Sequence, residues 1–166
     1  MEVAGVYAAM QREHTAAIGK LGAKRCWQAA LKVFQKFCAA QGHLVDEIVC
    51  NAAIKACQRS VQWQQALLLY EDANSTHKLQ HSILVHNTTL SACEKGKRWE
   101  QSLHLFGSQH WRRDTITVGV ALSACARGHL WQAAAALLEQ SSAMRVDLDI
   151  TCVNSAISAC DRAAEW

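Results

Sequence analysis

One segment that ends in tryptophan occurs five times in this chain. The copies read TAAIGKLGAKRCW, NAAIKACQRSVQW, NTTLSACEKGKRW, GVALSACARGHLW and NSAISACDRAAEW, and they end at Trp27, Trp63, Trp99, Trp131 and Trp166. Successive tryptophans are 36, 36, 32 and 35 residues apart. A period in the mid-thirties is typical of stacked supersecondary units. Function is therefore expected at positions that recur once per repeat, and not in a single catalytic cluster.

Composition supports a helical binding protein more than an enzyme. The 166 residues include no proline and are 51% hydrophobic, which suits a nearly all-helical chain. A net charge of +3 permits a polyanionic partner without requiring one. No apolar run approaches the roughly 20 residues that span a membrane. The sequence contains no nucleophile–base pair, metal cluster or phosphate loop, so we expect no enzymatic activity in these residues and no cofactor.

The eight cysteines are not arranged as ligands or disulfides. Equivalent repeat positions hold Cys57, Cys93, Cys125 and Cys160, which should place them about one repeat width apart. Cα atoms more than about 7 Å apart cannot be bridged by a disulfide. No Cys-x-x-Cys pair occurs, which disfavours zinc. We expect a small buried thiol where two helices approach closely.

Each repeat is predicted to be a pair of helices. In the second repeat, one apolar face at helical spacing is formed by Ile48, Ala53, Ile54 and Cys57. A turn follows at residues 59–62, and in the third and fourth repeats a glycine stands in this turn as a helix stop. The second helix then carries an apolar stripe with alanine or serine at its centre, where backbones can pack closely. The turn glycines are Gly96 and Gly128. The small residues at the centre of the second helices are Ala30, Ala66, Ser102 and Ala134.

Neither helix could bury its apolar face alone, so the pairs must stack. The predicted fold is all-α, a right-handed α-solenoid of antiparallel helix-turn-helix repeats with a core of the tryptophan, isoleucine/leucine and cysteine positions. Residues 1–10 are interpreted as the tail of a preceding partial repeat. The repeats that follow are 11–46, 47–82, a short third repeat at 83–114, 115–149 and a truncated fifth at 150–166.

Two local features bear on these boundaries. Gly107 is expected to end the second helix of the short third repeat early. Because the sequence stops inside a repeat, at Trp166, we interpret it as a fragment of a larger array. Its start resembles neither a secretory signal nor an Arg-rich transit peptide.

The start of each first helix resembles a known family. The segments DEIVCN (46–51), SILVHN (82–87), DTITVG (114–119) and DITCVN (149–154) are similar to the D-V-V-T-Y-N join of pentatricopeptide repeats. QQALLLYEDA (64–73) is similar to the family's E-A-L-x-L-F-x-x-M second helix. This chain departs from the family in two ways. The usual proline before the last residue is replaced by Val45, His81, Arg113 or Leu148, and tryptophan replaces an aliphatic residue at the start of the second helix.

The resemblance implies a single-stranded RNA-binding module that takes one base per repeat and acts in organellar RNA processing, stability or translation. The family reads each base with a side chain early in the first helix and with the last residue of the repeat. Here the implied pairs are Thr15 with Asp46, Asn51 with Ser82, Asn87 with Asp114 and Gly119 with Asp149, while Asn154 lacks its partner. Implied base-clamping residues are Ile48, Leu84, Ile116 and Thr151, and implied phosphate-near residues are Arg59, Lys95, Arg127 and Arg162.

By the family's preferences these pairs resemble guanine, cytosine and uracil readers in the first three repeats, and Gly119 has no side chain with which to read. The implied target core is 5′-G-C-U-3′. The implied partner is RNA and neither DNA nor a membrane, with other RNA-processing proteins as further candidates. The implied location is an organelle, with the chloroplast preferred over the mitochondrion.

Each implied role has a structural alternative. Asp46, Ser82, Asp114 and Asp149 precede a first helix, where Asp and Ser serve as N-caps. The recurrent asparagines could be first-turn polar residues without a ligand, and the basic residues could complement helix C-terminal dipoles. The alternative function is a tetratricopeptide-like scaffold that binds a peptide in its concave groove. A peptide groove gives no reason for an Asn-plus-Asp/Ser pair in each repeat, and this pair favours RNA.

Overall fold

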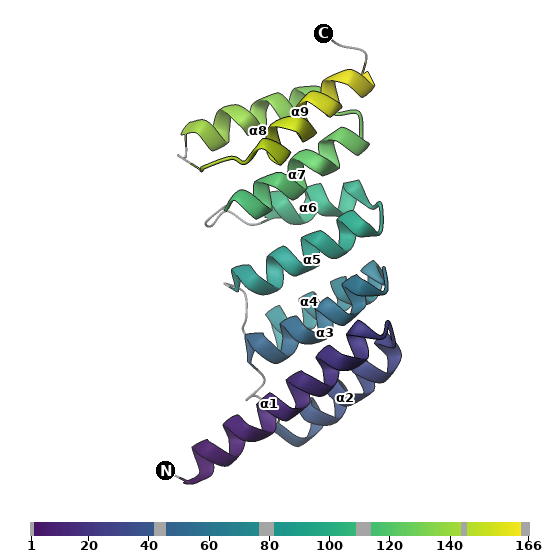
Figure 1. Ribbon diagram of the computed structural model, residues 1–166. Coiled ribbons are helices and arrows are strands. Elements are labelled where there is room, and N and C mark those ends of the chain that lie inside the picture. Colours follow the sequence, from purple (N-terminus) through teal and green to yellow (C-terminus); the bar gives the residue numbers. More distant parts are fainter. Residues whose placement is uncertain (1, 42–45, 77–81, 109–113, 144–145, 164–166) are drawn as a thin grey trace. The chain divides into compact units, whose positions relative to one another are not determined.

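The computed structural model describes residues 2–41, 46–76, 82–108, 114–143 and 146–163, and over these ranges the chain is helical apart from short turns (Figure 1). The elements are α1 (Glu2–Ala23), α2 (Trp27–Gln41), α3 (Glu47–Arg59), α4 (Trp63–Ser75), α5 (Ile83–Lys95), α6 (Trp99–Ser108), α7 (Thr115–Arg127), α8 (Trp131–Ala143) and α9 (Ile150–Ala163). The chain divides into two compact units, Met1–Ala92 and Cys93–Trp166. In the described ranges, no helix combines the length and the apolar character needed to cross a membrane.

Both units are built from adjacent helix pairs. In the first unit, α1 packs against α2 and α3, and α3 packs against α4 (Figure 1). In the second unit, α7 packs against α6, α8 and α9. The partners α1/α2, α3/α4 and α7/α8 run in opposite directions across tight turns. These observations confirm the predicted all-α architecture of antiparallel helix pairs.

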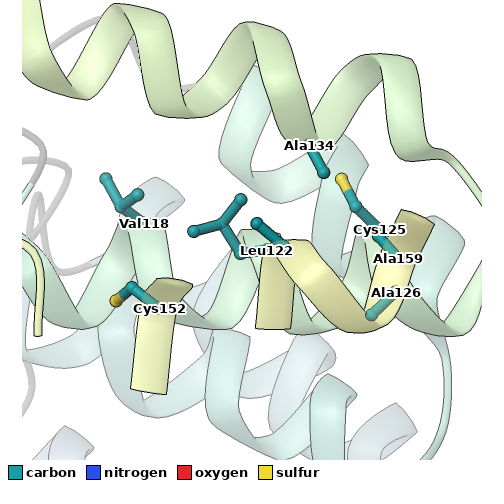
Figure 2. Close-up of a cluster of buried hydrophobic side chains, with 8 residues drawn as sticks. Val118, Leu122, Cys125, Ala126, Ala134, Cys152 and Ala159 are labelled. Carbon is teal, nitrogen blue, oxygen red and sulfur yellow. The ribbon is translucent and has the colours of Figure 1, made fainter. Parts of the chain in front are cut away.

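The predicted aliphatic and cysteine positions form the core of each unit. Ile18, Ile54, Leu90 and Leu122 are fully buried at equivalent positions, as are Cys57, Cys93 and Cys125. In the second unit, Leu122 and Cys125 lie in one cluster with Val118, Ala134 and Cys152 (Figure 2). The small residues predicted at the centre of each second helix are also fully buried, namely Ala30, Ala66, Ser102 and Ala134. These parts of the predicted core are confirmed.

The tryptophans do not belong to this core, and that part of the prediction is wrong. Trp27, Trp63, Trp99 and Trp131 are only half-buried, and Trp166 lies outside the described residues. Each is the first residue of a second helix, directly after a tight turn. The Trp99 ring packs so closely on Gly128 that a Cβ there would lie 2.8 Å from a ring carbon. Trp99 therefore packs against the end of α7, the first helix of the next repeat.

Five of the eight cysteines are buried and behave as small apolar residues, whereas Cys26 is exposed. All eight are free thiols, and burial raises the pKa of Cys57 and Cys93 to about 11 and that of Cys50 to about 12. Cys160 shares the repeat position of Cys57 but is only half-buried. Among the described residues, no three His, Cys, Asp or Glu side chains gather as a metal site.

The predicted glycine stops stand at the ends of two first helices, but the left-handed residue of each turn is not the glycine. Two first helices do end directly before Gly96 and Gly128, but Gly128 has an ordinary φ of −84°. The left-handed residue is the next one, Lys97 or His129, and Arg25 and Val61 are the counterparts in the first two repeats. The amide after that residue donates to a carbonyl five residues earlier, for example Gln62 N to Cys57 O at 2.9 Å. This hydrogen bond closes the turn in all four repeats, although the residue type at the left-handed position differs between them.

We expect Val61→Gly to stabilise the protein by about 1 kcal/mol, since a left-handed backbone costs a side-chain-bearing residue roughly 1–2 kcal/mol. Val61 has a φ of 60°, is β-branched and is 48% exposed, so glycine loses little packing there. Urea denaturation measures the change, and Val61→Ala is the control because it keeps the Cβ that causes the strain. A Val61→Gly protein less stable than Val61→Ala would contradict this explanation.

The helix bounds can be set beside the predicted repeats. α3, α5, α7 and α9 begin at Glu47, Ile83, Thr115 and Ile150. The expected boundary between residues 10 and 11 instead falls inside α1, which is one continuous helix of 22 residues. α6 has 10 residues and ends at Ser108, one residue after Gly107, whereas α4 and α8 have 13 each. Gly107 is therefore helical, and the residues that follow Ser108 lie outside the described part of the chain.

Candidate nucleic-acid interface

The last residue of each predicted repeat is a helix N-cap. A backbone N–H three residues later donates to the side chain of Asp46 (3.0 Å, from Val49), Ser82 (3.3 Å, from Val85), Asp114 (2.8 Å, from Thr117) and Asp149 (2.9 Å, from Cys152). The capping alternative is therefore confirmed at all four positions. In the three aspartates the bond uses Oδ1, so capping leaves the second carboxylate oxygen outside this contact.

Asp149 shows how strongly the cap favours an ionised side chain. It accepts hydrogen bonds from the Thr151 hydroxyl at 2.7 Å and from the Cys152 amide at 2.9 Å. The hydrogen bond from Thr151, followed by those from Cys152, lowers the pKa of this exposed carboxyl to about 2. The group is thus anionic at neutral pH and presents an acceptor at the surface.

Two residues after each cap, an apolar side chain is exposed. Ile48, Leu84 and Ile116 are 56%, 44% and 59% exposed, although Val49, Val85 and Thr117 next to them are buried. These three residues are the predicted base clamps, and the fourth, Thr151, is exposed as well. A single exposed apolar residue is unremarkable, but its occurrence at the same position in three successive first helices makes the exposure a feature of the repeat.

The first unit brings one predicted reading pair into a shared hollow. A cavity of about 480 Å³ is lined by Thr15 and Asp46 together with the predicted clamp Ile48. Gln11, Arg12 and Ala16 complete its wall. Arg12 was missed in the sequence, although it stands three residues before Thr15, as Ile48 stands three before Asn51. Alignment of the first repeat with the others would have identified Arg12 as the residue at the clamp position. The planar guanidinium group of an arginine can stack on a base.

The second unit has a more polar cavity of about 400 Å³ between α7 and α9. It brings the predicted reader Asn154 together with the predicted phosphate-near residues Arg127 and Arg162. Ser123, Ala126, Ser155 and Ser158 form the rest of the lining. Gly119 and Asp149, the predicted pair of the fourth repeat, do not line it. A Cβ at Gly119 would lie 3.1 Å from Cys152 Sγ, so a side chain there requires that neighbour to move.

The predicted phosphate-near arginines already have contacts inside the protein. Arg127 Nη2 lies 2.7 Å from Glu94 Oε1, in a partly exposed ion pair. Arg59 and Arg162 donate to carbonyls near the end of the preceding first helix, Gly19 O at 3.5 Å and Ala126 O at 3.4 Å. Lys95 is exposed. The arginine contacts agree with the alternative that these cations complement helix ends, and Glu94 offsets one of the charges.

The recurrent asparagines are at the surface or only half-buried. Asn51 and Asn87 are half-buried and Asn154 is exposed, so none is sealed in the core. The side-chain oxygen of Asn51 accepts a hydrogen bond from the Thr88 hydroxyl at 2.6 Å, within the first unit.

Comparison with known proteins shows similarity in structure only. No protein-family profile and no curated protein matches this chain. The crystal structure of the pentatricopeptide repeat protein PPR10 from maize matches 92% of the chain with a TM-score of 0.64 and 18% identity. PPR10 in complex with an 18-nt psaJ RNA element matches 96% with a TM-score of 0.69 and 22% identity, and so does its triple cysteine-to-serine variant. This chain covers 22–24% of the length of those proteins. Its fold is that of the pentatricopeptide repeat proteins.

Proposed function

We propose that this chain is a single-stranded RNA-binding module that takes one base per repeat and acts in RNA processing, stability or translation. The observation that carries the proposal is the recurring exposed apolar residue two positions after each helix cap, at Ile48, Leu84 and Ile116. The similar protein PPR10 has been crystallised with an RNA element. The shared fold supports the proposal. By analogy with the family, we propose that the chain acts in an organelle, with the chloroplast preferred over the mitochondrion.

Each proposed base contact has two components. In the second repeat, Ile48 and Leu84 supply flat apolar contact on the two faces of a base, which is sequence-tolerant and worth about 1–3 kcal/mol for stacking-type contacts. Asn51 supplies both a donor and an acceptor for the pairing edge of the base. Thr15 with Asp46 and Asn87 with Asp114 are proposed to act in the same way, so that the preferred core is 5′-G-C-U-3′.

The affinity of this chain should be low. About three or four base contacts of 1–3 kcal/mol each at best offset an association cost of about 4–15 kcal/mol. Because the arginines Arg59, Arg127 and Arg162 are held by contacts within the protein, phosphate attraction adds less than four free cations would. Binding should therefore be measured at low salt and high protein concentration.

Fluorescence anisotropy with a short labelled RNA that contains GCU tests the proposal. We expect binding that weakens as salt rises, and we expect Ile48→Ala to weaken it about fivefold or more, since a base contact is worth about 1–3 kcal/mol. Leu68→Ala is the matched control, because Leu68 is 57% exposed in the same repeat but lies on α4. If no RNA binds, or if Leu68→Ala weakens binding as much as Ile48→Ala, a peptide-binding scaffold becomes the better explanation.

A further inference from the structure

One carboxylate holds two side chains of the polar cavity between α7 and α9. Glu94, in the last turn of α5 and within the second unit, accepts hydrogen bonds at Oε1 from Arg127 Nη2 at 2.7 Å and from Ser123 Oγ at 3.2 Å. Ser123 and Arg127 both line the cavity. The charged residues of its lining are two arginines, Arg127 and Arg162. Glu94 thus places a negative charge beside a cavity whose own charges are positive.

The attraction of this cavity for an anion depends on its arginines. Ser155 and Ser158 each donate a hydrogen bond to a backbone carbonyl one turn earlier in α9, at 2.8 Å. The hydroxyl of Ser123 donates to the carboxylate described above. These three hydroxyl protons are therefore already used within the protein. The positive charge that could attract an anion comes from the guanidinium groups of Arg127 and Arg162.

The repeat position of Glu94 determines what the arginine of the next repeat contacts. Arg59 and Arg162 each lie one repeat after a residue without a charged side chain, and both donate to backbone carbonyls. Arg127 lies one repeat after Glu94 and forms an ion pair instead. A carbonyl leaves the net charge of an arginine in place, whereas a carboxylate offsets it. The residues at this position, five before each tryptophan, are Gly22, Gln58, Glu94, Ala126 and Asp161.

We propose that Glu94 is an intramolecular competitor for RNA phosphate, which keeps the affinity of the fourth repeat for RNA low. A phosphodiester group beside Arg127 is repelled by the Glu94 carboxylate, and it gains the full attraction of this arginine only when it displaces that carboxylate. Gly119 of the same repeat has no side chain with which to hold a base. The fourth repeat is thus the one that holds RNA least tightly. The inference rests on the proposed function, because it takes RNA as the anion.

Glu94→Gln tests the inference, because the amide keeps the size of the side chain and removes its charge. Affinity of the whole chain for the labelled GCU-containing RNA is measured by fluorescence anisotropy at about 20 mM and about 200 mM salt. One more neutralised phosphate of a single strand steepens the slope of log affinity against log salt by about 0.7. The loss of affinity over this tenfold range of salt should therefore be about fivefold larger in Glu94→Gln than in the wild-type chain. The variant should also bind more tightly at the lower salt concentration.

Glu139→Gln is the matched control. It removes the same charge from an exposed residue of α8, a helix that contributes no residue to the described lining of the cavity. Salt dependence and affinity should stay close to those of the wild-type chain. A second control adds Arg127→Gln to Glu94→Gln. This double variant should lose the gain in affinity, because the proposed competitor acts through Arg127.

Three results would overturn the inference. They are a wild-type salt dependence in Glu94→Gln, a gain that persists without Arg127, and a loss of stability in urea without any gain in affinity, which would assign Glu94 a purely structural role. In each case, wild-type RNA binding that Ile48→Ala weakens still supports the proposed function. If neither the wild-type chain nor Glu94→Gln binds the RNA at the lower salt concentration, the proposed function and this inference both fail.

Discussion

Leu122→Ala should lower the free energy of unfolding by about 3 kcal/mol, within the 2–5 kcal/mol range for fully buried leucine truncations. Leu122 is fully buried in the cluster with Val118, Cys125 and Cys152 (Figure 2). The loss has two causes, namely the transfer free energy of the deleted methyl groups and the cavity that they leave. Small residues such as Ala134 and Ala126 surround the site, and they cannot extend into the space.

Ile157→Ala is the control for this prediction. Ile157 has the equivalent position in the fifth repeat, but it is 51% exposed. Its truncation should change stability by no more than about 0.5–1 kcal/mol, as for other surface positions. Both variants can be followed by urea denaturation with circular dichroism at 222 nm, a wavelength that reports helix content. Equal losses at the two positions would show that the buried cluster does not determine the stability of this unit.

The repeat period was enough to predict the buried aliphatic, cysteine and small positions, because burial at Ile54, Leu90 and Leu122 follows from which face of the first helix meets its neighbours. It was not enough for the tryptophans. Their size and recurrence suggested the core, but Trp99 begins a helix directly after a turn and is only half-buried there. Position within the helix pair, and not hydrophobicity, determined its environment.

The candidate site was predictable in its positions but not in its contacts. The exposure of Ile48 and Ile116 and the helix caps at Asp46 and Asp149 occur at residues that the sequence singled out. Contacts such as Arg127 with Glu94 depend on the rotation of one helix against the next and on side-chain rotamers, which no spacing reveals. The contact of Thr88 with Asn51 is of the same kind, because it joins residues in different repeats.

The last prediction concerns the close approach of α1 and α3. A Cβ added at Gly22 would lie 2.8 Å from Ala56 Cβ and 3.0 Å from Ala56 Cα, both closer than side chains tolerate. Ala56 belongs to the interior of α3, and its backbone cannot move aside without shifting the helix. Overpacking of this kind costs about 1–3 kcal/mol, and the better helix propensity of alanine recovers only part of it near a helix end. We therefore expect Gly22→Ala to destabilise the protein by about 1–2 kcal/mol.

Gly19→Ala separates packing from propensity, because it makes the same chemical change one turn earlier in α1. Nothing lies within 4 Å of a Cβ at Gly19, so only the propensity term remains, and it should stabilise the protein by about 0.5–1 kcal/mol. The two variants should thus change the free energy of unfolding in opposite directions, and the two values should differ by about 2 kcal/mol in urea denaturation. A stabilising Gly22→Ala would mean that α1 and α3 pack less closely than described here. Because these two helices carry Thr15 and Ile48, the spacing of the proposed first base contact would then need revision.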